Sequence, residues 1–207
     1  IREAYKDSVG VWTWSVGLTS ATGHDVTRYI DKPQTFEHCL AVYVWALGHY
    51  AEAVRAEFGE HPLTKEQFAG ALSFHWNTGS IRSASWPDLF KQGKTAEARE
   101  SFLSWKKPPE IQDRRKKECA LFFDGKWSND GKITEYRVKK PSHTPDWGSA
   151  KRIDISKELR AAFKAAGTVD PPPPPPPPTT GKQAVAGGIG ALLVAAVVGI
   201  LIWIGVL

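Results

Sequence analysis

Near the start of the chain lies the stretch Tyr5-Lys6-Asp7-Ser8-Val9-Gly10-Val11-Trp12-Thr13-Trp14-Ser15-Val16-Gly17. It alternates with period two, with Val11 and Thr13 on one side of the pattern and Trp12 and Trp14 on the other. Gly10, between Val9 and Val11, can turn the backbone, so the stretch predicts a short β-hairpin. Such a rigid hairpin would hold the carboxylate of Asp7 and the hydroxyl of Thr13 on one face, where they can position a water molecule. An Asp near a Gly is also a common turn former, and the spacing alone leaves that interpretation open.

Helical patterns dominate the sequence after this hairpin. Residues 20–34 are predicted as a loop, and apolar residues then recur at helical spacing over 36–58. Thr64 and Gln67 have the spacing of a capping box, which predicts a helix from there to about Trp76, ended near Gly79. Shorter helices are expected at 87–91, 95–105 and 113–123. The chain is therefore predicted to be α+β, mainly helical with an N-terminal β-hairpin.

Four motifs occur in an order and spacing that resemble one known family. Tyr5, Asp7, Gly10 and Thr13 match the pattern Tyr-x-Asp-x-x-Gly-x-x-Thr. The later motifs are Leu72-Ser73-Phe74-His75-Trp76-Asn77-Thr78-Gly79, Phe102-Leu103-Ser104-Trp105 and Arg114-Arg115-Lys116-Lys117-Glu118. Together they resemble the phage-type lysozymes, the muramidases of glycoside hydrolase family 24, over residues 1–127.

This resemblance implies a catalytic domain that cleaves the β-1,4 bond between N-acetylmuramic acid and N-acetylglucosamine in bacterial peptidoglycan. It implies that Asp7 positions or activates the attacking water and that Thr13 holds this water. Trp14, Trp76 and Asn77 are the expected substrate-binding residues. The resemblance implies no cofactor, and the histidines and cysteines lack the spacing of metal ligands, so no metal is expected.

The general acid of the family is a Glu nine positions before Asp7, and that position precedes Ile1. We therefore expect the sequence to be N-terminally incomplete, either a fragment or a processed product. Glu3 lies only four residues before Asp7 and does not replace the acid by spacing. Ser15 and Leu18 also depart from the family pattern, which usually has Gly and often has His at these places.

The net charge of +5 suits an anionic polymer such as peptidoglycan. Because basic residues are dispersed among acidic ones, we expect no nucleic-acid partner. The one dense run, 114–117, is interpreted as a solvated helix face, with a polyanion contact as the alternative. Cys39 and Cys119 are the only cysteines, and the sequence leaves a disulfide between them open.

The sequence changes character after residue 127. Alternation at Thr134, Tyr136 and Val138 predicts a strand, and 154–166 predicts an amphipathic helix, so 128–170 is expected to be an extension docked on the catalytic domain. Eight consecutive prolines then begin a linker at 171–183, which would span about 25 Å as polyproline II.

The last 24 residues, 184–207, carry no charge. As a helix they would span about 36 Å, against about 30 Å for the hydrocarbon core of a bilayer, so we expect a single-pass C-terminal transmembrane helix. The expected location is thus a membrane, the host inner membrane if the protein is phage-derived.

Together these features predict a monomeric, membrane-tethered endolysin whose partners are peptidoglycan and, through 184–207, a lipid membrane. Two alternatives remain open. One is a catalytically inactive, membrane-anchored peptidoglycan-binding module, and the other is a structural lysis-accessory protein.

Overall fold

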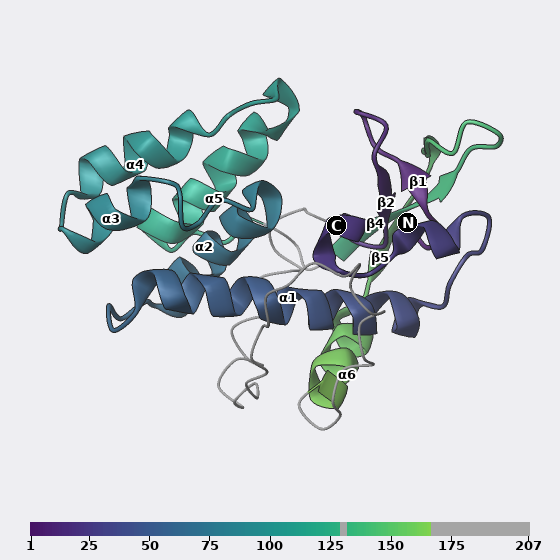
Figure 1. Ribbon diagram of the computed structural model, residues 1–207, viewed down its shortest axis with the longest axis horizontal. Coiled ribbons are helices and arrows are strands. Elements are labelled where there is room, and N and C mark those ends of the chain that lie inside the picture. Colours follow the sequence, from purple (N-terminus) through teal and green to yellow (C-terminus); the bar gives the residue numbers. More distant parts are fainter. Residues whose placement is uncertain (129–131, 167–207) are drawn as a thin grey trace, which may run out of the picture. The chain divides into compact units, whose positions relative to one another are not determined.

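The computed structural model describes residues 1–128 and 132–166, which divide into two compact units. The first unit contains residues 1–46 and 132–166, and the second contains residues 47–128. Helix α1 (Phe36–Phe58) contributes residues to both units (Figure 1). The fold is α+β, mainly helical with an N-terminal β-hairpin, which confirms that part of the prediction.

The first unit begins with a three-stranded antiparallel sheet of β1 (Tyr5–Lys6), β2 (Trp12–Trp14) and β3 (Leu18–Thr19), in the order β1-β2-β3. Gly10 has a φ of 84°, a value that favours glycine, and it makes the predicted turn. The expected loop then contains two 3-10 helices, η1 (Ser20–Thr22) and η2 (Val26–Tyr29).

A second hairpin completes the first unit, formed by β4 (Lys132–Val138) and β5 (Pro145–Asp154), followed by α6 (Ser156–Ala166). The sequence predicts β4 and α6 but not β5. In the register, Glu135 pairs with Lys151 while Arg137 pairs with Asp146, which leaves residues 147–150 in a bulge opposite residue 136. This bulge interrupts the alternation of β5. The turn between these strands contacts β1, since the Lys6 N–H donates to the carbonyl of His143 at 2.7 Å.

The second unit is helical, and its helices lie where the sequence predicts them. After the end of α1 come α2 (Lys65–Thr78), α3 (Trp86–Lys91), α4 (Thr95–Ser104), η3 (Pro109–Ile111) and α5 (Gln112–Asp124). The capping box is present, with Thr64 accepting from the Gln67 N–H and Gln67 accepting from the Thr64 N–H. Gly79 ends α2 in the left-handed conformation.

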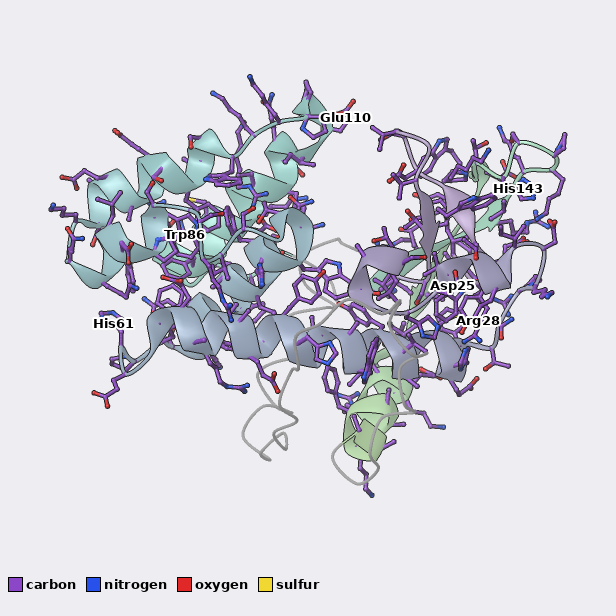
Figure 2. The ribbon with its side chains drawn as sticks, viewed as in Figure 1. Asp25, Arg28, His61, Trp86, Glu110 and His143 are labelled. Carbon is purple, nitrogen blue, oxygen red and sulfur yellow. The ribbon has the colours of Figure 1, made fainter. Side chains whose placement is uncertain are left out.

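Aromatic rings fill the core of the second unit. Trp86, labelled in Figure 2, has no exposed surface, and its ring lies 4.8 Å from the rings of both Phe102 and Phe122. Helices α2 and α5 approach closely at Gly70, where an added Cβ would lie 2.9 Å from the Cβ of Phe122. This close approach brings the arginines of α5 against the end of α2.

The predicted polyproline linker at 171–183 and transmembrane helix at 184–207 lie outside the described residues. Among the helices of 1–128 and 132–166, none combines the length and the apolar character needed to cross a bilayer. The domain boundaries proposed from the sequence stay predictions.

Candidate active site

Asp7 closes the turn of the N-terminal hairpin with a single carboxylate oxygen. Its Oδ1 accepts hydrogen bonds from the N–H groups of Val9 at 3.0 Å and Val11 at 2.8 Å. The structure gives Oδ2 no hydrogen-bond partner among residues 1–128 and 132–166. Asp7 is therefore a turn former, and it keeps a second oxygen with which it can also bind water.

Thr13 lies on the same face of the hairpin, and its residue is only 4% exposed. Its Oγ1 donates to the main-chain carbonyl of Val11 at 3.2 Å. Because this bond uses the hydroxyl proton, the lone pairs of Oγ1 are available to accept a hydrogen bond from a water. The structure thus brings the two predicted catalytic residues together, one on each side of Val11.

Tyr5 joins this face because it is paired directly with Thr13 in the register of β1 and β2. Burial, with a further contribution from the charge of Asp7, raises the pKa of Tyr5 to about 12. The hydroxyl therefore stays protonated and can act as a donor beside Asp7. The sequence motif contains Tyr5 but assigns it no role, although period-two alternation places it with Asp7 and Thr13.

Trp14 lies in the interior of the first unit. It has no exposed surface, its ring stacks on Tyr29 with 3.9 Å between centroids, and its Nε1 donates to the carbonyl of Arg2 at 3.0 Å. This burial argues against the predicted contact of Trp14 with saccharide. Alternation identifies the side of the strand that carries Trp14, but not the segment of chain that covers it.

That covering segment is held by a histidine–tyrosine cluster. The hydroxyl of Tyr29 lies 2.8 Å from Nε2 of His24 and 2.8 Å from Nε2 of His38. Burial lowers the pKa of both histidines. The cluster therefore packs as uncharged rings around Trp14 at neutral pH.

The other two predicted substrate-binding residues belong to the second unit, at the end of α2. Trp76 is half-buried, and its ring lies 4.9 Å from that of Tyr50. Asn77 accepts a hydrogen bond at Oδ1 from Nη2 of Arg115 at 2.6 Å. The side-chain oxygen of Asn77 thus already accepts a hydrogen bond inside the protein. The contacts of Asn77 and of Trp76 with substrate stay predictions.

The basic run of α5 contains a buried ion pair, which corrects its interpretation as a solvated face. Arg115 is 1% exposed and Glu118 has no exposed surface, and their side chains form a salt bridge. Arg114 binds the same carboxylate at 2.8 Å, and Nε of Arg115 donates to the carbonyl of Trp105 at 2.8 Å. Four consecutive residues cover the full circumference of a helix, so such a run cannot all lie on one face.

Both cysteines are free and buried, Cys39 in the first unit and Cys119 in the second. Burial raises the pKa of Cys39 to about 11, which keeps its thiol protonated and unreactive at neutral pH. Within the described part of the chain, no group of three or more His, Cys, Asp or Glu is placed to hold a metal ion.

Comparison with known families decides the assignment of this fold. The family model for phage lysozyme matches residues 1–118, which include the Asp7 turn, the end of α2 and the Arg115–Glu118 pair. The chain belongs to the phage lysozyme family. A search of curated proteins found no match.

Membership in the phage lysozyme family implies a peptidoglycan hydrolase of the glycosidase type. The lysozyme match ends before β4, β5 and α6, so the second hairpin and its helix are additions to the matched region. The matched region contains Asp7 and Thr13, and the addition contacts the hairpin that carries them.

Proposed function

We propose that this phage lysozyme family member is a muramidase that cleaves the β-1,4 bond between N-acetylmuramic acid and N-acetylglucosamine in peptidoglycan. The observation that supports this most is that Asp7 and Thr13 lie on one face of the hairpin, bonded to the same carbonyl of Val11, within the matched family region. A carboxylate oxygen and a hydroxyl oxygen presented together are what a glycosidase needs to hold an attacking water.

In the proposed reaction, Oδ2 of Asp7 accepts a hydrogen bond from the water and stabilises the positive charge that develops on the sugar ring. Oγ1 of Thr13 accepts the second hydrogen of the same water. By resemblance, the general acid is a Glu nine residues before Asp7, which protonates the leaving glycosidic oxygen. Asp7 takes the proton that the water loses as its oxygen bonds to the anomeric carbon. The proposed mechanism uses no cofactor.

The test is the chemical identity of the new reducing end. Purified peptidoglycan is digested with the protein as its whole coding sequence specifies it, including any residues before Ile1. The product is reduced with borohydride and hydrolysed, and the sugar alcohols are quantified. A muramidase produces muramitol, whereas cleavage of the other glycosidic bond produces glucosaminitol. Neither sugar alcohol would appear if the protein only binds the wall, and that result contradicts the proposal.

Reading the coding sequence before Ile1 tests the role of the expected acid. A Glu nine residues before Asp7 supports the enzyme, and its replacement by Gln should reduce muramitol release by about 10² to 10⁴. Another residue at that position favours an inactive peptidoglycan-binding module.

We further propose that the protein is an endolysin tethered to a membrane through residues 184–207, on the basis of their uncharged sequence. The chain should then sediment with membranes and resist carbonate extraction. Replacing Val197 and Val198 with Lys should abolish the membrane association, because each central Lys costs about 2.5 to 3.5 kcal/mol on insertion. Retention of the double variant in the membrane fraction contradicts the proposed anchor.

A further inference from the structure

The second hairpin carries a tryptophan on its surface. Trp147 is 66% exposed, far more than the other tryptophans of the described residues except Trp127, which is 37% exposed. A single exposed apolar residue needs no explanation. An exposed aromatic ring that is held in one orientation does need one, because aromatic rings in fixed positions are frequent centres of binding.

The ring of Trp147 is held in place by its surroundings. It packs edge-to-face on Tyr136, with 5.0 Å between centroids and 80° between planes. Trp147 opens the bulge of β5, and this bulge is fixed by Ser149, whose Oγ accepts from the Arg137 N–H at 2.8 Å and donates to the Asp146 carbonyl at 2.7 Å. The exposed ring therefore requires little additional ordering when it binds a partner.

Polar groups flank this ring on the same face of the hairpin. Thr134 is two residues from Tyr136 and is paired directly with Arg152, whose Nη1 donates to Oγ1 of Thr134 at 3.3 Å. On the opposite face Ile133, which is buried, is paired with Ile153, which is half-buried. We call the outward set Thr134, Tyr136, Trp147 and Arg152 the aromatic strip.

The charge of the hairpin suits an anionic ligand. Residues 132–154 contain six Lys or Arg, at 132, 137, 139, 140, 151 and 152, and three acidic residues, at 135, 146 and 154. Peptidoglycan carries carboxylates on its muramic acid and peptide stems, and its sugar rings have apolar C–H faces that stack on aromatic rings. The aromatic strip offers both complementary features, a ring and a guanidinium.

The aromatic strip is also tied to the hairpin that carries Asp7. Nε of Arg2 binds Oε1 of Glu135 at 2.7 Å, and the Lys6 N–H donates to the carbonyl of His143 at 2.7 Å. His143 lies on the β4–β5 turn (Figure 2), and its ring is 5.3 Å from that of Trp12. A ligand held on the aromatic strip is thus held by the same unit as the proposed catalytic residues.

We propose that the aromatic strip is a second saccharide-binding surface, outside the active site, that retains the enzyme on the glycan strands of peptidoglycan. The identity of the glycan rests on the proposed function. A bilayer fits this surface less well, because the strip has two aromatic rings and no aliphatic side chain to insert among lipid tails.

The experiment measures binding of the full chain, in mild detergent and at low temperature, to lipid-free peptidoglycan sacculi stripped of phosphate-containing wall polymers. Trp147→Ala should raise the apparent Kd about tenfold. Trp147→Tyr should restore most of the affinity, since it returns an aromatic face. Trp127→Ala is the matched control and should bind like the parent protein. Hydrolysis of a short soluble muropeptide oligomer by Trp147→Ala should be unchanged.

Equal binding of sacculi by Trp147→Ala and the parent protein overturns the proposal. So does an equal loss of soluble-substrate hydrolysis and of binding, because the strip would then belong to the active site. If Trp147→Ala does not fold by circular dichroism, Arg152→Glu decides: it leaves the ring packing intact and should weaken binding, and unchanged binding again overturns the proposal. Absence of muramitol release by the parent protein, with Trp147-dependent binding retained, rejects the proposed function while supporting this inference.

Discussion

Asp7 and Thr13 share one hydrogen-bond acceptor, the main-chain carbonyl of Val11. The Asp7 N–H donates to it at 3.0 Å and Oγ1 of Thr13 at 3.2 Å, while the Val11 N–H donates to Oδ1 of Asp7. The relative position of the carboxylate and the hydroxyl is therefore set by the main chain of one residue, Val11. A change at Asp7 or Thr13 can be separated into an effect on the turn and an effect on the chemistry.

Asp7→Asn should separate the two roles of Asp7. The amide oxygen can still accept from Val9 and Val11, so the melting temperature should change little, whereas turnover should fall by about 10² or more because the negative charge is lost. Asp7→Ala should in addition lose about 1 to 2 kcal/mol of stability, because both turn bonds disappear. Wall turbidity and thermal unfolding measure these effects. Full activity of Asp7→Asn would show that Asp7 only forms the turn.

Thr13→Val should test the hydroxyl at nearly constant shape. The residue is buried, so the variant keeps its packing, loses about 1 kcal/mol with the bond to Val11, and should lose about tenfold or more in turnover. Thr13→Ser is the control, since it keeps the hydroxyl. If Thr13→Val keeps full activity while Thr13→Ser loses it, the methyl group rather than the hydroxyl is important.

Lys140→Ala should loosen the contact between the two hairpins of the first unit. Its Nζ binds Oε2 of Glu3 at 2.7 Å and also pairs with Asp31, so its loss should cost about 1 kcal/mol and speed hydrogen exchange at the Lys6 amide, which donates to His143. Lys139→Ala, at the neighbouring exposed position, should leave both quantities unchanged. Equal exchange rates in the two variants would contradict the role of Lys140 as a tether.

Arg115→Leu should destabilise the second unit by about 3 kcal/mol, because it removes one of the two arginines that neutralise the buried Glu118 carboxylate, while Arg114 stays paired with it. Lys116→Leu changes the next residue of the same helix, which is exposed, and should alter stability by less than about 0.5 kcal/mol. Urea unfolding followed by tryptophan fluorescence measures both. Similar small effects would restore the interpretation of a solvated basic face.

Stability should fall in mild acid because of His75. Burial, with a smaller contribution from Arg82, lowers the pKa of His75 to about 4 from 6.5. The unfolded chain then binds more protons than the folded one between about pH 6.5 and pH 4, so the free energy of unfolding decreases as pH falls through this window. The loss should reach about 2 to 3 kcal/mol, and His75→Gln should reduce the slope. Identical pH profiles of the two proteins would exclude His75 as the cause.

The local elements of this protein are determined by its sequence, because their signals lie within a few residues of one another. Gly10 makes the hairpin turn, Thr64 and Gln67 begin α2, and Gly79 ends it, each through backbone conformations or hydrogen bonds inside the element. The face shared by Asp7 and Thr13 follows from the same period-two alternation.

Only the tertiary structure decided which of these side chains are buried and what they bind. Trp14 is covered by Tyr29, and Arg115 is held by Asn77, 38 positions away, so neither environment can be read from a local pattern. Strand β5 escaped prediction because its bulge interrupts alternation, and that bulge gives Trp147 its exposed position. Periodicity records the direction of a side chain from its own backbone, while burial depends on which distant segment packs against that side.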